Sequence, residues 1–307
     1  MGTGCLAATG RRKRRGSGMK NGLMFTIKAI ALWLALMVGQ ILSGMVILAM
    51  VHGPLPGSLA NEPLTAIQAM AIVAAAFAVV LGLLAATMRW STWGKAAALF
   101  VILYGLETLL SFIESIYFNT YLHLPVMLLA GMAVGNIIKA GLVAVACALL
   151  WPAKSGVPAE PLGGLVWKLP VIIPLYILVY FAAGQFIAWQ GAELRDYYGQ
   201  GLQIDRLQLS LLQVFRGAIW AGLALLLVKS LKGGIWQRAV MTGLAFAVLM
   251  ALVLLMPNPY MPWAVRRMHL LEVFSSNFLF GIACVLILMA GKPGPDSKAS
   301  LPGAAHP

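Results

Sequence analysis

Residues 96–118 read AAALFVILYGLETLLSFIESIYF, and the architecture of the protein can be inferred from this segment. It is long enough to cross a bilayer, because a spanning helix needs about 20 apolar residues. It also holds two carboxylates, Glu107 and Glu114. A charge at mid-membrane costs about 2.5–3.5 kcal/mol on insertion scales, so it usually has a partner or a function. The stretch therefore predicts a transmembrane helix whose polar face is turned into a bundle.

The rest of the chain has the same character. Its 307 residues are 61% hydrophobic and only 10% charged, whereas soluble domains carry about 25% charged residues. The apolar runs are rich in Leu, Ala, Val and Met with little alternation, which favours helices over the strands of an outer-membrane barrel. We predict an all-α membrane protein, an eight-span helical bundle with spans at 24–50, 65–88, 96–118, 124–151, 168–190, 207–228, 235–256 and 268–290.

The basic residues are distributed unevenly between the two sides of this arrangement. Of 22 Lys and Arg, sixteen fall on the side that holds both termini and four on the other. This is the positive-inside pattern, so we expect a multi-pass protein of the cytoplasmic (inner) membrane with both termini in the cytoplasm. The partner it implies is the lipid bilayer. We expect no nucleic-acid partner, because even the RRKRR run at 11–15 belongs to a membrane protein's cytoplasmic side.

The chain divides around one Pro- and Gly-rich segment. We expect a disordered basic extension over 1–18, a first four-helix unit over 19–151, a cytoplasmic linker over 152–166, a second four-helix unit over 167–290, and a disordered tail over 291–307. Cys147 and Cys284 lie in apolar helices and predict small core residues. Neither their spacing nor any other motif predicts a metal site or a cofactor.

The two units show a faint self-similarity. Gly39-Gln40 matches Gly184-Gln185, Trp93 with Lys95 matches Trp236 with Arg238, and Gly135-Asn136 matches Ser276-Asn277, at offsets of 145, 143 and 141 residues. Four spans in each unit give both units the same orientation, so a 4+4 repeat would be parallel, with its axis along the membrane normal. The alternative is chance, since Gly and Trp are common near helix ends.

The third span carries its polar residues at steps of three and four. These residues are Tyr104, Glu107, Ser111 and Glu114, and their spacing places them on one helical face. The fourth span carries Asn136 and Lys139, and the sixth carries Gln213 and Arg216. Gly131 and Gly135 next to Asn136 favour close helix packing.

The charges inside the membrane are nearly balanced. We expect Arg216 to pair with one carboxylate of the third span and Lys139 with the other, because breaking a buried pair costs about 3–5 kcal/mol. The simplest alternative is that these pairs only fix helix register.

The last span opens with a polar stripe of Arg266, His269, Glu272 and Ser276, followed by Asn277. His269 and Glu272 are three residues apart and suit a hydrogen bond better than a metal site, which needs further ligands. Gln40 and Gln185 lie in the outer halves of their own spans. The polar groups thus run from the midplane outward and predict an outward-facing polar cavity closed from below by apolar residues. Residues 191–206 are expected to form a loop or a short interfacial helix at its rim.

Three functions fit this pattern. The first is a transporter or permeation protein for a small polar or ionic solute, with Glu107 and Glu114 able to carry protons. The second is a scaffold or assembly protein without chemistry. The third is an enzyme acting on a lipid-linked substrate at the outer leaflet, with Arg266 and Arg267 holding an anion. The chain has no HExxH, GxSxG or Walker motif, so its sequence argues against an enzyme.

Overall fold

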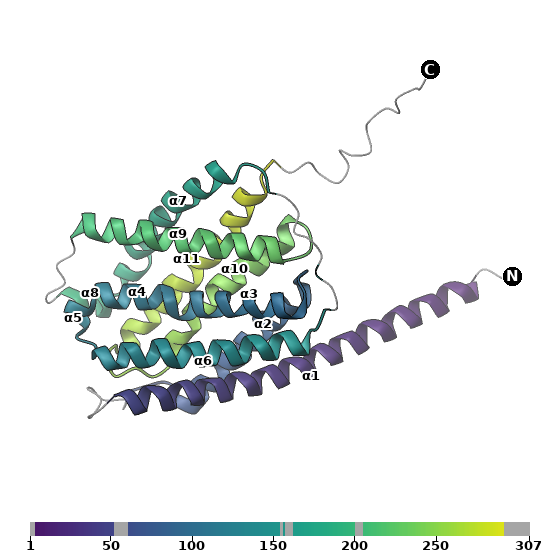
Figure 1. Ribbon diagram of the computed structural model, residues 1–307, viewed down its shortest axis with the longest axis horizontal. Helices are drawn as coiled ribbons and strands as arrows, with labels where there is room; N and C mark the ends of the chain where they lie inside the picture. The colour runs from purple at the N-terminus through teal and green to yellow at the C-terminus, as the bar shows by residue number, and fades with distance from the viewer. Residues whose placement is uncertain (1–3, 52–60, 154–155, 157–161, 200–204, 292–307) are drawn as a thin grey trace, which may run out of the picture.

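The protein is an all-α bundle in its computed structural model, which describes residues 4–51, 61–153, 156, 162–199 and 205–291, with side chains from Lys20 onward. Eight helices in these ranges are long and apolar enough to cross a membrane (Figure 1). Every predicted span end lies within five residues of the observed one. The observed spans are Lys20–Met50, Ala66–Thr87, Thr92–Tyr117, Val126–Leu150, Leu165–Gln190, Arg206–Ser230, Ile235–Leu255 and Trp263–Met289.

Five of the spans are single helices and three are composite. The single helices are α1 (Gly4–Met50), α2 (Ala66–Thr87), α6 (Val126–Leu150), α9 (Arg206–Ser230) and α11 (Trp263–Met289). The third span joins α3 (Thr92–Tyr104), a π-helix η1 (Gly105–Leu109) and α4 (Leu110–Tyr117). The fifth joins α7 (Leu165–Phe186) and η2 (Ala188–Gln190), and the seventh joins α10 (Ile235–Ala251) and η3 (Leu252–Leu255).

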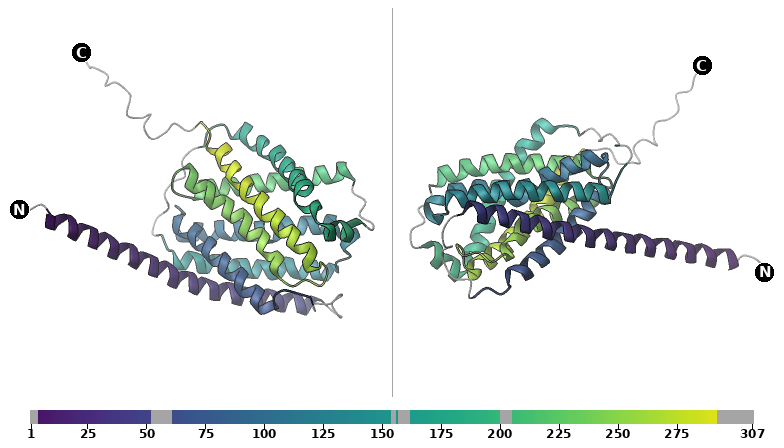
Figure 2. Two further views of the ribbon diagram at one scale, coloured as in Figure 1. Left: turned by 180° about the vertical axis from the view of Figure 1, so that it is seen from behind. Right: turned by 60° about the horizontal axis from the view of Figure 1, so that its bottom comes forward.

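Two short helices connect spans. They are α5 (Asn119–Leu122) and α8 (Ala192–Gly199), so the segment at 191–206 contains a short helix, the alternative that the sequence left open. Helix α1 continues from Gly4 without a boundary at residue 18, and its beginning projects beyond the bundle (Figure 2). The predicted disorder of 1–18 stays a prediction. Most of the expected tail at 291–307 and part of the linker at 152–166 lie outside the described residues.

Helix packing follows the same plan in both halves of the chain. In the first half α1 packs on α2 and α6, and α3 packs on α6; in the second half α7 packs on α9 and α11, and α10 packs on α11. The halves meet where α3 contacts α9 and α2 contacts α10. These contacts join spans three and six and spans two and seven. If each span is replaced by the corresponding span of the other half, four places away, the first contact becomes the second and the second becomes the first. The contact pattern is therefore that of a two-fold arrangement.

A backbone bridge lies where the axis of that arrangement would pass. Met88 and Leu231 form an isolated antiparallel bridge, and they are 143 residues apart. The Arg89 N–H donates to the Ser230 carbonyl at 2.8 Å, and the Lys232 N–H donates to the Thr87 carbonyl at 3.0 Å. The two bonds are reciprocal: exchanging each residue for the one 143 positions away, the offset that separates Lys95 from Arg238, turns one bond into the other. The offset of 143 residues, one of the three found in the sequence comparison, therefore also relates the two residues of this backbone bridge.

The end of the bundle that holds this bridge is lined by buried cations. We call it the basic end and the opposite one the far end. The Lys95 Nζ donates to the Trp151 carbonyl at 2.9 Å, and the Lys168 Nζ donates to the Leu288 and Ala290 carbonyls at 3.1 and 2.8 Å. Arg89 donates to the Leu231 carbonyl in the same way. Helix C-termini carry unpaired carbonyls and a partial negative charge, and these cations satisfy both.

Small residues bring α1 and α6 into close contact. A Cβ on Gly135 would lie 2.7 Å from the Ser43 Oγ and 2.8 Å from its carbonyl oxygen, and one on Gly131 would lie 3.1 Å from the Ile47 Cα. The Ser43 Oγ also donates to the Asn136 Oδ1 at 3.0 Å. The close approach expected from these glycines is confirmed, and it agrees with the role of small residues between membrane helices.

This contact can be tested with two glycines of the same helix. We expect Gly135→Ala to lower the free energy of unfolding by about 1–3 kcal/mol, because the Ser43 backbone must move away. Gly141→Ala meets nothing within 4 Å, so it should be neutral or stabilising by up to about 1 kcal/mol. Thermal unfolding of both variants in the same detergent checks this, and equal effects would contradict the packing described.

Candidate functional site

The two carboxylates of the third span face different neighbours. In a regular α-helix seven residues turn by about 700°, so Glu107 and Glu114 would point almost the same way. The π-helix η1 adds a residue to the turn that holds Glu107 and changes the helical phase. Glu107 consequently meets Lys139 on α6, whereas Glu114 meets Arg216 on α9. The prediction of one continuous polar face is wrong for this reason.

Tyr104 is the residue that leaves that face. It lies in an apolar groove of about 280 Å³ between α3 and α9, together with Phe100, Ile219 and Gly222. Its ring stacks on that of Phe100, with the centroids 5.9 Å apart. Tyr104 therefore lines an apolar groove and not a polar cavity.

The inner ion pair is closed off from its surroundings. Lys139 and Glu107 form an ion pair with side chains that are each 7% exposed. Gly39 of α1 packs on the Lys139 stem, since a Cβ there would lie 2.9 Å from the Lys139 Cγ. The Glu107 Oε2 is buried and has no hydrogen-bond partner among the described residues. The pair is thus fixed on one oxygen and unsatisfied on the other.

The outer ion pair is part of a larger network. The Arg216 Nη1 lies 2.9 Å from the Glu114 Oε1, which also accepts from the Tyr180 hydroxyl at 3.1 Å. The Gln213 Oε1 accepts from the Arg216 Nη1 at 3.0 Å and from the Tyr176 hydroxyl at 3.1 Å. The guanidinium carbon is 5.9 Å from each of the two tyrosine rings. Arg216 is therefore held by a carboxylate, an amide and two aromatic faces.

The predicted pairing of these four charges is confirmed. The two pairs differ in access: the Arg216 side chain is 2% exposed, whereas that of Glu114, nearer the far end, is 28% exposed. Exposure thus rises from the inner pair to the outer carboxylate.

His269 and Glu272 form a third polar group towards the far end. The His269 Nδ1 lies 2.9 Å from the Glu272 Oε2, as expected, and its Nε2 lies 3.2 Å from the Tyr198 hydroxyl of α8. Burial raises the pKa of the Tyr198 hydroxyl, and the neighbouring carboxylates of Glu114 and Glu272 contribute to the same shift. Tyr198 therefore lies near both the outer ion pair and the His269 group.

We call these three groups together the polar cluster: Glu107, Lys139, Glu114, Arg216, Gln213, Tyr176, Tyr180, Tyr198, His269 and Glu272. Towards the basic end it rests on aromatic residues. Trp220 packs on Phe246 with centroids 4.5 Å apart, and Tyr176 packs on Phe280 at 5.5 Å. Trp220, Phe246 and Phe280 are each at most 1% exposed. A packed apolar floor thus separates the polar cluster from the basic end.

Several predicted supporting residues lie outside the polar cluster. Asn136 bonds to Ser43 and joins α6 to α1, Gln185 is exposed, and Asn277 donates to the Met250 Sδ at 3.4 Å. The Ser276 hydroxyl is bonded within its own helix, to the Glu272 carbonyl. Ser111 is half-buried, and the Gln40 Oε1 is buried without a partner among the described residues. Asn136 thus contributes to the contact between α1 and α6, whereas the Ser276 hydroxyl is satisfied within α11.

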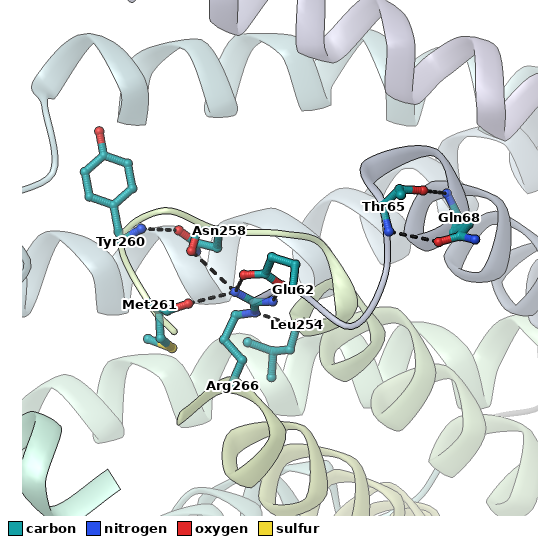
Figure 3. A network of polar contacts seen from close by, with 8 residues as sticks. All are labelled: Glu62, Thr65, Gln68, Leu254, Asn258, Tyr260, Met261 and Arg266. Atoms are coloured by element: carbon teal, nitrogen blue, oxygen red, sulfur yellow. Dashed lines mark hydrogen bonds and ion pairs between the residues drawn. The ribbon is translucent and has the colours of Figure 1, made fainter. Parts of the chain in front are cut away.

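Arg266 has a different partner from the one expected. It is 1% exposed and forms an ion pair with Glu62, whose Oε1 accepts from the Arg266 Nη1 at 2.9 Å (Figure 3). Its remaining donors bind the carbonyls of Leu254 at 3.0 Å and Met261 at 2.7 Å. Arg266 thus ties the segment before α2 to the connection between α10 and α11.

Sequence reasoning missed Glu62 because it lies outside the spans, in the segment that precedes α2, where a carboxylate needs no explanation. The other arginine at this surface, Arg267, donates to Glu193 at 2.6 Å, in a pair that is about half exposed on both sides. Both arginines that were expected to hold an anion therefore bind protein carboxylates. Within the described ranges, no group of three or more His, Cys, Asp or Glu side chains is arranged to hold a metal ion.

Comparisons of the chain with models of protein families, with curated proteins and with solved structures find no match. The fold and its polar cluster define the class: a polytopic α-helical membrane protein with paired charges inside the bundle.

The Glu62–Arg266 pair predicts a specific pH dependence. The hydrogen bond from Arg266 holds the pKa of Glu62 below its ordinary value. Its stabilisation is therefore complete above the unfolded pKa of about 4.3 and is lost as the pH falls through the lower folded pKa. We expect Glu62→Gln to cost about 3–5 kcal/mol at pH 7 and to weaken the loss of stability between pH 5 and 3.

Thermal unfolding across this pH range measures the effect. Glu193→Gln, which breaks the exposed pair with Arg267, is the control and should change the melting temperature little, since exposed pairs contribute weakly. If the melting temperature of Glu62→Gln falls with decreasing pH as steeply as that of the wild type, the Glu62 carboxylate does not contribute to the acid sensitivity of the fold.

Proposed function

We propose that the protein is a transporter or permeation protein for a small polar or ionic solute, which enters the bundle from the far end. In this proposal the basic end lies in the cytoplasm, as the positive-inside rule requires, and the membrane is the cytoplasmic one. The solute reaches Glu114 and Arg216 first, and the Lys139–Glu107 pair closes the path below them. For the solute to pass, this pair and the apolar floor beneath the polar cluster would both have to open.

The observation that carries the proposal is a set of buried polar atoms without partners. Within the described residues these include the Glu107 Oε2, the Gln213 Nε2 and the Arg216 Nε, all in the polar cluster. A buried unsatisfied polar atom costs about 1–3 kcal/mol. Ion pairs kept only for stability would be expected to satisfy their atoms, because a half-satisfied network is worse than an apolar core. The cluster is instead suited to exchange its partners for those of a solute or a proton.

One observation argues against the enzyme hypothesis, and one experiment separates transport from the scaffold hypothesis. The enzyme hypothesis depended on free arginines at the far end, and Arg266 and Arg267 are paired with Glu62 and Glu193. The scaffold hypothesis predicts that the buried pairs can be replaced by apolar residues without loss of activity. That prediction separates the scaffold from the transporter in one experiment.

The test uses purified protein in liposomes and measures the uptake of labelled lactate, glycine, choline and glycerol. We expect at least one solute to enter faster than into protein-free liposomes. Glu107→Gln should slow that uptake about tenfold or more, which corresponds to a barrier raised by at least ~1.4 kcal/mol. Glu193→Gln, outside the polar cluster, is the matched control. Uptake no faster than in protein-free liposomes for every solute would overturn the proposal.

The double variant Glu107→Leu/Lys139→Met separates folding from function. Replacing a buried ion pair by apolar residues of similar volume is often neutral for stability, so we expect wild-type thermal unfolding. Uptake should nevertheless be lost, because the apolar pair cannot open to a polar solute. A double variant that folds and still transports would exclude this pair from the mechanism.

A further inference from the structure

Seen from the far end of the bundle, the Glu114 carboxylate lies in front of the Arg216 guanidinium. Arg216 is 1% exposed and lies beside the rings of Tyr176 and Tyr180, whereas Glu114 reaches it from α4 with 28% of its side chain exposed. A group that approaches from the far end therefore meets the Glu114 carboxylate before it meets the guanidinium. Glu114 occupies the position that an incoming acceptor would need.

The site has more donors than acceptors. The orientation of the Gln213 amide is fixed, because its Oε1 accepts from both the Arg216 Nη1 and the Tyr176 hydroxyl. Its Nε2 must then point away from them, and it is buried with no partner among the described residues, as is the Arg216 Nε. Gln213 is fully buried. Two buried donors thus lack an acceptor next to a buried cation.

Glu114 does not use the full capacity of the guanidinium. The Arg216 Nη1 lies 2.9 Å from the Glu114 Oε1, and that oxygen is shared with the Tyr180 hydroxyl. A guanidinium can donate two parallel N–H bonds to a carboxylate, which accepts on two oxygens. A carboxylate that is free to choose its position could also bind the unused donors, which the tethered Glu114 does not satisfy.

We infer that the solute carries a carboxylate, that this carboxylate binds Arg216 and Gln213, and that Glu114 is its tethered substitute in the empty site. The inference rests on the proposed function and names its substrate class. A carboxylate is the class of anion that the site already accommodates, since Glu114 is one and a guanidinium can hold both oxygens of a carboxylate in its plane. Once displaced, Glu114 turns to the far end, where its side chain is already partly exposed.

The experiment removes the substitute and supplies the probe from solution. Glu114→Ala leaves Arg216 without its carboxylate and should lower the melting temperature in detergent by several degrees. Sodium formate should restore it in a saturable way, because a ligand that binds only the folded state stabilises in proportion to ln(1 + [L]/Kd). The same concentrations of chloride or sulfate should restore less than half as much.

Two variants control for general salt effects. Glu107→Ala removes the carboxylate of the inner pair, whose side chains are each 7% exposed, so formate should restore it no better than chloride does. The double variant Glu114→Ala/Arg216→Met lacks the cation and should show no specific response to formate. If Glu114→Ala does not fold, Glu114→Gln keeps the side-chain shape and is measured in its place.

The outcomes separate this inference from the proposed function. Formate that restores Glu114→Ala or Glu114→Gln no better than chloride, or no better than sulfate, overturns the carboxylate site. In that case the uptake of glycerol or choline into liposomes would leave transport standing. Specific restoration by formate combined with uptake of lactate or glycine supports both, and restoration without uptake of any solute supports the site and overturns transport.

Discussion

The bundle depends on the rule that a charge inside a membrane must have a partner within the protein. Lipid can solvate neither ammonium nor carboxylate, so each buried charge selects the neighbour that neutralises it. Glu107 and Lys139 join two spans of the first half, whereas Glu114 and Arg216 join one half to the other. The third span carries both carboxylates and is therefore the element that both halves are built around. Its π-helix is the geometric means by which one helix serves two partners.

The frame of the molecule could be read from the sequence, whereas the direction of its side chains could be read only in part. The span ends and the four paired charges follow from hydrophobic length and charge balance. The sequence of Gly105–Leu109 contains no signal for a π-turn, and a regular period therefore placed Tyr104 with Glu107. Arg266 shows the other limit: a loop carboxylate 204 residues away is its partner, and neither helical period nor spacing reports a contact of that range.

The frame follows a two-fold plan, but the polar cluster does not. The positions that the offsets assign to Glu107, Arg216 and Lys139 in the opposite half are Met250, Val73 and Phe280, which are buried at 8%, 2% and 1% exposure. These apolar residues belong to the core, and Phe280 is part of the floor beneath the cluster. A symmetric frame thus carries ionisable groups in one set of positions and close packing in the other. This division places the polar cluster on one side of the bundle and keeps its counterpart apolar and closely packed.

The buried cations at the basic end would complicate any attempt to invert the membrane topology of this chain by mutation. Lys95 and Lys168 count towards the charge bias that orients the spans during insertion, and the same ammonium groups satisfy the last carbonyls of α6 and α11. The ammonium groups of Lys95 and Lys168 therefore contribute both to the charge bias and to the stability of the folded bundle. Removing these lysines to invert the topology would also leave helix ends uncapped, so a reversed chain would have to fold without bonds that the natural orientation supplies.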